Sequence, residues 1–128
     1  MDIEPSKPVE WLGSTQDDMR AMPEAVRRVF GYALYIAQMG GVHPDAKPLR
    51  GFGGHNVMEV VANFDGDTYR EVYTARFEEA VYVLHVFHKK SHQGIRTPKR
   101  DLDTINARLK QAEARHRQYL QSKRQQEQ

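Results

Sequence analysis

The stretch that decides the fold reads Val57-Met58-Glu59-Val60-Val61-Ala62-Asn63-Phe64, then Asp65-Gly66, then Thr68-Tyr69-Arg70-Glu71-Val72-Tyr73-Thr74-Ala75-Arg76-Phe77, and then Val81-Tyr82-Val83-Leu84-His85-Val86-Phe87-His88-Lys89-Lys90. β-Branched and aromatic residues of this kind suit a pleated sheet. Asp-Gly is typical of a tight hairpin turn, because glycine accepts the positive φ that such a turn needs. The stretch therefore predicts three antiparallel strands.

The polar residues of this stretch collect on one face of the predicted sheet. Two-residue turns would place Val61 opposite Arg70 and Val72 opposite His85, and side chains alternate between faces. The expected core face carries Met58, Val60, Ala62, Phe64, Tyr69, Tyr73, Phe77, Tyr82, Leu84 and Val86, interrupted by Glu71. The opposite face carries Glu59, Arg70, Thr74, Arg76, His85 and Lys89, with Val57, Val61, Val72, Val81, Val83 and Phe87 between them. We expect this second face, with Arg70 partly exposed, to hold the chemistry.

Helical patterns precede and follow the three strands. Residues 8–12 predict a short edge strand, and residues 14–21 and 23–39 predict two helices that cover the apolar face. After the strands, Thr97 is expected to cap a C-terminal helix that begins at Pro98 and frays beyond about residue 119. The prediction is an α+β domain with a small antiparallel-dominated sheet, two N-terminal helices on one face and a C-terminal helix.

Length and composition limit the class of protein. A chain of 128 residues predicts one domain, 1–128, and we expect residues 1–7 and about 120–128 to be flexible. Cysteine is absent, which excludes disulfides and thiolate metal sites. No apolar run reaches the roughly 20 residues of a membrane span, so we expect a cytoplasmic protein with no membrane partner.

The polar face carries the groups that RNA cleavage without a metal requires. Attack of a ribose 2′-OH on the adjacent phosphate needs a base, an acid and cations that stabilise the phosphoryl charge. Arg70 is assigned to the phosphate because its planar fork matches two oxygens, and Lys90 is a second candidate cation. The candidate bases and acids, among which the sequence does not choose, are Glu59, His85, His88 and His92. Phe87 or Phe52 is a candidate for stacking a base.

Positive charge is concentrated after the last predicted strand. Residues 88–100 hold five Lys and Arg side chains and no acid. Together with two earlier arginines, they predict an RNA-binding surface made of Arg50, Arg76, Lys89, Arg96, Lys99 and Arg100. No carboxylate cluster has metal-ligand spacing, and neither a metal nor another cofactor is expected.

Three motifs carry a resemblance to a known family. They are Tyr69-Arg70-Glu71-Val72-Tyr73, then Val81-Tyr82-Val83-Leu84-His85-Val86-Phe87-His88-Lys89-Lys90-Ser91, and then Thr97-Pro98-Lys99-Arg100-Asp101. Over about residues 8–112 the chain resembles the phage-related HigB branch of the RelE/ParE toxin superfamily. In that resemblance, Arg70 matches the arginine of the Tyr-Arg-x-x-Tyr strand, and Lys90 or Lys89 matches the basic residue that ends the last strand. Val61 stands where related toxins often have an arginine.

The resemblance implies a RelE-like fold and the toxin of a type II toxin–antitoxin pair. Such toxins usually cleave mRNA in the ribosome and are neutralised by a small helix-turn-helix antitoxin. The expected partners are therefore a HigA-like antitoxin, the ribosome and mRNA, with operator DNA reached only through the antitoxin. Two alternatives remain open: a ParE-like inhibitor that binds gyrase without catalysis, and an inactive binding module of the same fold.

Overall fold

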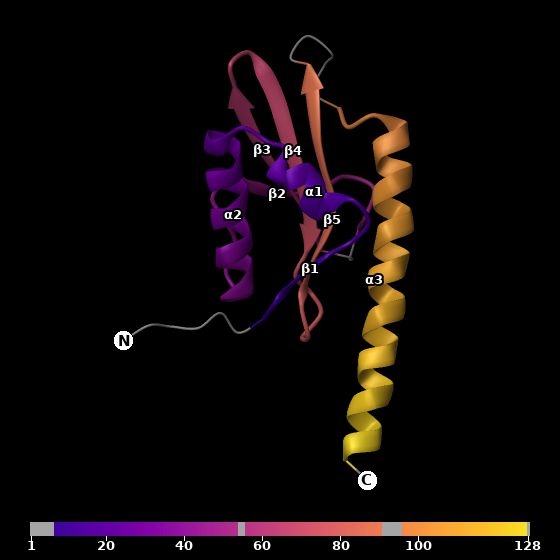
Figure 1. Cartoon of the computed structure of the whole chain (residues 1–128). Helices are drawn as coiled ribbons and strands as arrows, with labels where there is room; N and C mark the ends of the chain where they lie inside the picture. Colours follow the sequence, from indigo (N-terminus) through magenta and orange to yellow (C-terminus); the bar gives the residue numbers. More distant parts are fainter. Residues whose placement is uncertain (1–6, 54–55, 91–95, 128) are drawn as a thin grey trace, which may run out of the picture.

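The computed structural model of the chain describes residues 7–53, 56–90 and 96–127 (Figure 1). Within these residues, one sheet has the strand order β1-β5-β4-β3-β2, in which β1 is parallel to β5 and the other pairs are antiparallel. The elements are β1 (Val9–Trp11), α1 (Thr15–Arg20), α2 (Glu24–Gln38), β2 (Ala46–Pro48), β3 (Val57–Phe64), β4 (Asp67–Thr74), β5 (Val81–Lys90) and α3 (Lys99–Gln126). The predicted α+β class, with two N-terminal helices and a C-terminal helix, is confirmed.

The hairpin between β3 and β4 follows the predicted register. Asp65 and Gly66 both have positive φ, at 51° and 83°, as a tight turn between twisted strands requires. Val61 consequently pairs with Arg70 across the two strands. This hairpin fixes the relative positions of Glu59 and Arg70, which face the same side of the sheet.

The hairpin between β4 and β5 contains an irregularity that the sequence pattern does not predict. Val72 pairs with His85 as expected, but Tyr73 pairs with Val83, so Leu84 is an extra residue in β5. Such a bulge reverses the facing of every residue beyond it. Contrary to the expectation, Tyr82 and Leu84 therefore pack on the same side as Val72, and Val81 and Val83 pack on the other side, with Tyr73.

Helix α2 covers the first face of the sheet. Its apolar residues recur at helical spacing, and the buried members are Val26, Phe30, Ala33, Leu34 and Ala37. They pack with Val60, Tyr69, Tyr73 and Val86 of the sheet. In Figure 1, α1 and α2 lie on the side of the sheet opposite to α3.

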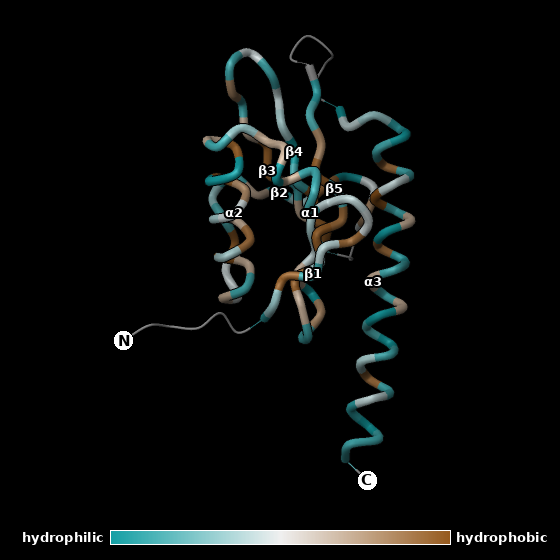
Figure 2. The backbone as a smooth tube through the Cα atoms, viewed as in Figure 1, coloured by the Kyte–Doolittle hydropathy of each residue, from teal (hydrophilic) through white to brown (hydrophobic). Residues whose placement is uncertain are grey.

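Helix α3 covers the second face, which is therefore a second core rather than an open surface. Ile105, Leu109 and Ala112 are buried against a cluster that includes Val57, Val72 and Leu84. Phe77, expected on the first face, belongs to this cluster too. Helix α3 runs on to Gln126, beyond the point near Tyr119 where fraying was expected. Figure 2 shows that its last turns are mostly hydrophilic, and Figure 1 shows them extending past the sheet.

None of the helices in the described ranges is long and apolar enough to cross a membrane.

Candidate functional site

The centre of the candidate site is an ion pair between β3 and β4. Arg70 Nη1 donates a hydrogen bond to Glu59 Oε1 at 3.0 Å. The side chains are 7% and 14% exposed, respectively, so Arg70 is buried rather than partly exposed as expected. Water screens such a pair poorly, and the carboxylate occupies the position beside the guanidinium that a phosphate oxygen would take.

Thr97 completes the environment of the Glu59 carboxylate. Its hydroxyl donates to Glu59 Oε2 at 3.0 Å. The sequence predicts Thr97 as the cap of α3, but the N-cap residue is Pro98 and no side-chain cap bond is present there. The chain just before α3 is therefore tied to strand β3 at the candidate site.

His85 lies on the same face and is held from both sides. Its Nε2 is 2.8 Å from Asp101 Oδ1, and its Nδ1 is 3.3 Å from Arg108 Nη1. Because an arginine only donates, Nδ1 must accept, and the ring proton then lies on Nε2 and is donated to Asp101. Arg108 also donates to the Leu84 carbonyl at 3.0 Å. His85 thus connects β5 to the first turns of α3.

A glycine makes room for this arrangement. A Cβ at Gly13 would lie 2.6 Å from Arg108 Nη2, and Gly13 has a φ of +56°. Both the close approach and the left-handed backbone favour glycine at this position. The turn between β1 and α1 therefore shapes the site from the far end of the sequence, which the sequence pattern did not indicate.

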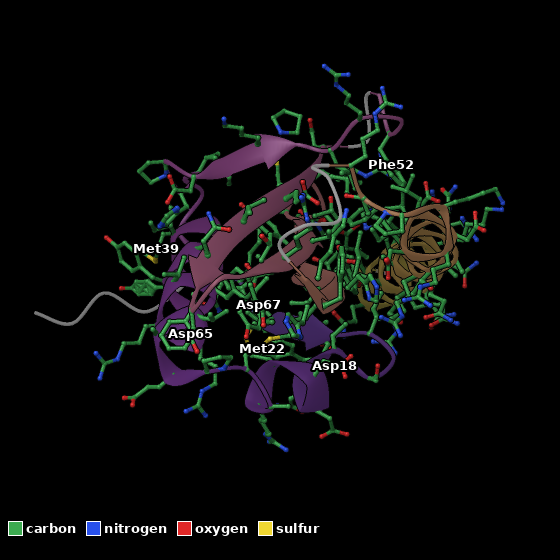
Figure 3. All side chains as sticks on the ribbon, turned by 90° about the horizontal axis from the view of Figure 1, so that it is seen from above. Asp18, Met22, Met39, Phe52, Asp65 and Asp67 are labelled. Carbon is green, nitrogen blue, oxygen red and sulfur yellow. The ribbon has the colours of Figure 1, made fainter. Side chains whose placement is uncertain are left out.

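Phe87 separates Arg70 from His85 on this face. It pairs with Arg70 across the strands, and its ring stacks on that of His85 with centroids 4.5 Å apart. Phe87 is only partly buried, so it remains a candidate for base stacking. Phe52, the other candidate, is buried in the cluster under α3, and Figure 3 shows it on that side of the sheet.

His88 is not brought to the same face. The alternation along β5 directs it to the side of α1, where Nε2 is 2.9 Å from Asp67 Oδ2 and the ring stacks on Tyr69 at 4.6 Å. A cleft of about 540 Å³ at the edge of β5 is lined by these two rings, by Asp18 of α1 and by Met22 just after this helix, and Figure 3 labels the last two residues. His92 lies outside the described residues, and so does the side chain of Lys90, whose backbone ends β5.

The predicted RNA-binding residues divide into two groups. Arg50, Arg96, Lys99 and Arg100 are exposed, and Lys99 forms an ion pair with Asp103 at 3.2 Å. Lys89 Nζ donates to the Arg96 carbonyl at 2.5 Å, which supports the segment before α3.

Arg76 is engaged within the fold instead. Its Nη2 lies 3.0 Å from Glu113 of α3, and its guanidinium lies over the Phe77 ring at 4.4 Å. These contacts link the end of β4 to α3, so we assign Arg76 a structural role.

Lys47 is a cation near the site that the sequence prediction omitted. It pairs with Glu59 across β2 and β3, and paired residues share a face of the sheet. Lys47 is exposed at the sheet edge. Its place could have been found only by predicting β2 and its register.

Glu79 and Tyr82 lie away from the ion pair, and their pKa values are shifted in opposite directions. Glu79 Oε1 is 2.8 Å from His116 Nδ1, and Tyr82 donates to Glu79 Oε2 at 2.7 Å. Burial acts to raise the pKa of Glu79, but these hydrogen bonds outweigh it and the pKa is lowered. Burial, with the neighbouring Glu79, raises the pKa of Tyr82.

Glu71 is fully buried between the sheet and α2. Among the described residues, neither of its oxygens has a hydrogen-bond partner. Burial raises the pKa of Glu71 well above its usual 4.5. Burial, together with the charge of Glu71, raises the pKa of Tyr73 to about 12. The sequence identified Glu71 as an interruption of the apolar face, and it lies opposite the candidate site.

No three His, Asp or Glu side chains are grouped to hold a metal ion in the part of the chain that the structure describes.

Comparison with known proteins places the chain in a family. No curated protein and no solved structure matches it. Residues 17–110, well over half of the chain, match the family described as Phage derived protein Gp49-like. The matched range includes Glu59, Arg70, His85 and Thr97. The chain therefore belongs to the phage-derived Gp49-like family, a RelE/HigB-like family associated with the toxins of toxin–antitoxin pairs.

Proposed function

We propose that the protein is a toxin that cleaves mRNA on the ribosome by metal-independent attack of the ribose 2′-OH on the adjacent phosphate. The observation that carries the proposal is the Glu59–Arg70 pair, which places a carboxylate and a guanidinium 3.0 Å apart on the face that also holds His85. A base and a phosphate-binding fork side by side are what this reaction needs.

The closed pair suggests how substrate would engage. A phosphate that approaches Arg70 competes with the Glu59 carboxylate for the same donors. When the phosphate takes the guanidinium, the Glu59 oxygen that accepted from Arg70 becomes free to accept a proton. Glu59 then accepts the proton of the 2′-OH while Arg70 stabilises the charge on the phosphoryl oxygens. Substrate binding would thus generate the base.

The other site residues take supporting roles. His85 has both ring nitrogens engaged, Nε2 by Asp101 and Nδ1 by Arg108, so it can act as the acid only after Arg108 releases Nδ1 and that nitrogen takes up a proton to pass to the leaving oxygen. Exposed Lys47, Arg50, Arg96 and Arg100 would contact RNA phosphates. A HigA-like helix-turn-helix antitoxin would neutralise the toxin and carry the contact with operator DNA.

The test is to induce the chain briefly in bacteria and to map new 5′ ends on several mRNAs. We expect cuts inside translated codons, and we expect Arg70→Lys and Glu59→Gln to remove most of them, because the first loses the planar fork and the second the base. Removing a proton-transfer group typically slows such a step by roughly 10²–10⁴-fold. Arg28→Lys, in an exposed ion pair of α2, is the matched control and should cut like the wild type.

The other outcomes lead to different functions. Growth arrest without new 5′ ends would support the gyrase-binding alternative, for which a buried Glu59–Arg70 pair would be only a structural ion pair. Neither arrest nor cleavage would indicate an inactive binding module. More cleavage by Glu59→Gln than by the wild type would identify Glu59 as an inhibitory anion instead of the base.

A further inference from the structure

We infer that Thr97 is a positioning residue for the Glu59–Arg70 pair: its hydroxyl fixes the carboxylate that in turn orients the guanidinium. The activity part of this inference rests on the proposed function. The geometric part stands on the contacts alone and has its own measurement.

The first argument is the hydroxyl of Thr97 itself. The side-chain oxygen of a threonine just before a proline at a helix start usually accepts a capping hydrogen bond from a first-turn N–H group. Here Pro98 is the N-cap residue without a side-chain cap bond, and its carbonyl accepts from Asp101 and Leu102, each at 3.0 Å. The Thr97 hydroxyl is instead directed to Glu59, on another element.

The second argument is the way the Glu59 carboxylate is held. Oε1 accepts from Arg70 and Oε2 accepts from Thr97, each at 3.0 Å. Lys47 is the cross-strand neighbour on β2, and Val72 is the neighbour on β4. The terminal torsion of a glutamate is broad when nothing holds the carboxylate. Here both oxygens are engaged, which fixes the plane of the carboxylate.

The third argument is that the backbone near Thr97 is anchored on both sides. Before it, Lys89 donates to the Arg96 carbonyl. After it, Asp101 bonds to His85 at 2.8 Å. A hydroxyl held between two anchors can hold its acceptor in turn, and such supporting contacts keep reacting groups within a fraction of an ångström of productive geometry.

The position of Thr97 also matters once substrate is present. If a phosphate displaces Glu59 from Arg70, the Thr97 bond is the contact that keeps the carboxylate at the site. Thr97 would therefore preserve the distance between the base and the bound phosphate during the exchange.

The experiment compares Thr97→Val, which has the same shape without the hydroxyl, with Thr97→Ser, which keeps the hydroxyl. Thr104→Val is the matched control, because Thr104 lies nearby on α3 and donates to the Arg100 carbonyl of its own helix. The first readout is the side-chain NMR signal of Arg70 in the full chain. We expect slow guanidinium rotation in the wild type, Thr97→Ser and Thr104→Val, and faster rotation in Thr97→Val.

The second readout is single-turnover mRNA cleavage on ribosomes. We expect Thr97→Val to lower the maximal rate by about tenfold with little change in the half-saturating concentration, since the hydroxyl affects geometry and not RNA binding. Thr97→Ser should restore the rate to within about twofold of wild type. In a Glu59→Gln background, Thr97→Val should change neither readout much further, because the carboxylate is already absent.

Each outcome decides a separate question. An unchanged Arg70 signal in Thr97→Val overturns the inference. A changed signal with an unchanged cleavage rate overturns the role in catalysis. If even the wild type does not cleave RNA, the proposed function fails, while the Arg70 signal still decides whether Thr97 positions the pair. If Thr97→Val does not fold, Thr97→Ala compared with Thr97→Ser in the same two assays replaces it.

Discussion

The two faces of the sheet treat buried polar groups in opposite ways. Under α3, Glu59 accepts hydrogen bonds from Arg70 and Thr97. Glu79 on the same face is hydrogen-bonded by His116 and Tyr82. Under α2, Glu71 is fully buried and, within the described residues, has no hydrogen-bond partner. Donor groups around a buried acid favour its ionised form, whereas burial without partners favours its protonated form.

Because of this difference, the acids under α3 can form a functional site, whereas Glu71 under α2 only destabilises the fold. A carboxylate beside a guanidinium, such as Glu59 beside Arg70, can accept a proton or exchange for a phosphate. The α3 face therefore holds groups that can take part in a reaction. Glu71 under α2 has no such partner among the described residues, and because burial raises its pKa, it destabilises the fold as the pH rises. Polar residues inside a core thus indicate function only when their partners lie there too.

The largest effect should come from removing Arg70. We expect Arg70→Ala to lower the free energy of unfolding by about 3–5 kcal/mol, because it leaves the Glu59 carboxylate buried without its cation. Urea unfolding at neutral pH measures this. The double variant Arg70→Met with Glu59→Gln should recover part of the loss, since no charge remains buried. A loss below about 1 kcal/mol for Arg70→Ala would mean that the pair is open to solvent.

A smaller effect of opposite sign is expected at Glu71. Glu71→Leu should raise the free energy of unfolding at pH 7 by about 1–3 kcal/mol, because an unpartnered acid leaves the core. The pKa of Glu71 is raised in the folded state, so the folded state binds this proton more tightly than the unfolded state. The wild type should therefore lose stability as the pH rises from 4.5 toward the raised value, by up to about 1.4 kcal/mol per pH unit.

Glu71→Gln is the control for that pH dependence. It keeps the shape of the side chain but cannot titrate, so its unfolding free energy should lack the decline above pH 4.5 that Glu71 causes. A wild type whose stability does not decline relative to Glu71→Gln in this range would show that Glu71 has partners in solution, and the contrast between the faces would disappear.

Local sequence signals predicted the parts of the fold that local chemistry determines. Asp65-Gly66 determined the register of the first hairpin, because only one register fits a two-residue turn with positive φ. This register places Glu59 diagonally across from Arg70 on the same face of the sheet. The apolar periodicity from Val26 to Ala37 predicted α2 and its buried face in the same way.

The remainder depends on contacts between distant segments. The extra residue Leu84 has no local signal, since the bulge depends on the pairing of β1 with β5 and on the packing of α3. Thr97 fits a local role as a cap, but its hydroxyl donates to the charged Glu59 acceptor on a distant strand, a bond that the local pattern does not indicate. The sequence pattern does not indicate the place of Arg108 between Gly13 and His85, which depends on the full three-dimensional arrangement.

The smallest effect should come from His116, which partners Glu79 on the α3 face. We expect His116→Ala to lower the free energy of unfolding at neutral pH by about 1 kcal/mol, the value of one hydrogen bond. The pKa of Glu79 is lowered in the folded state, so its contribution is present above pH 4.5 and is lost as the pH falls through the lowered value. The variant should therefore lose less stability on acidification than the wild type, as urea unfolding at pH 3 and pH 7 would measure. Glu71 changes the unfolding free energy in the opposite direction with pH, so a variant that lacks both Glu71 and His116 should respond least to pH. If His116→Ala loses as much stability on acidification as the wild type, Tyr82 is the partner that stabilises ionised Glu79.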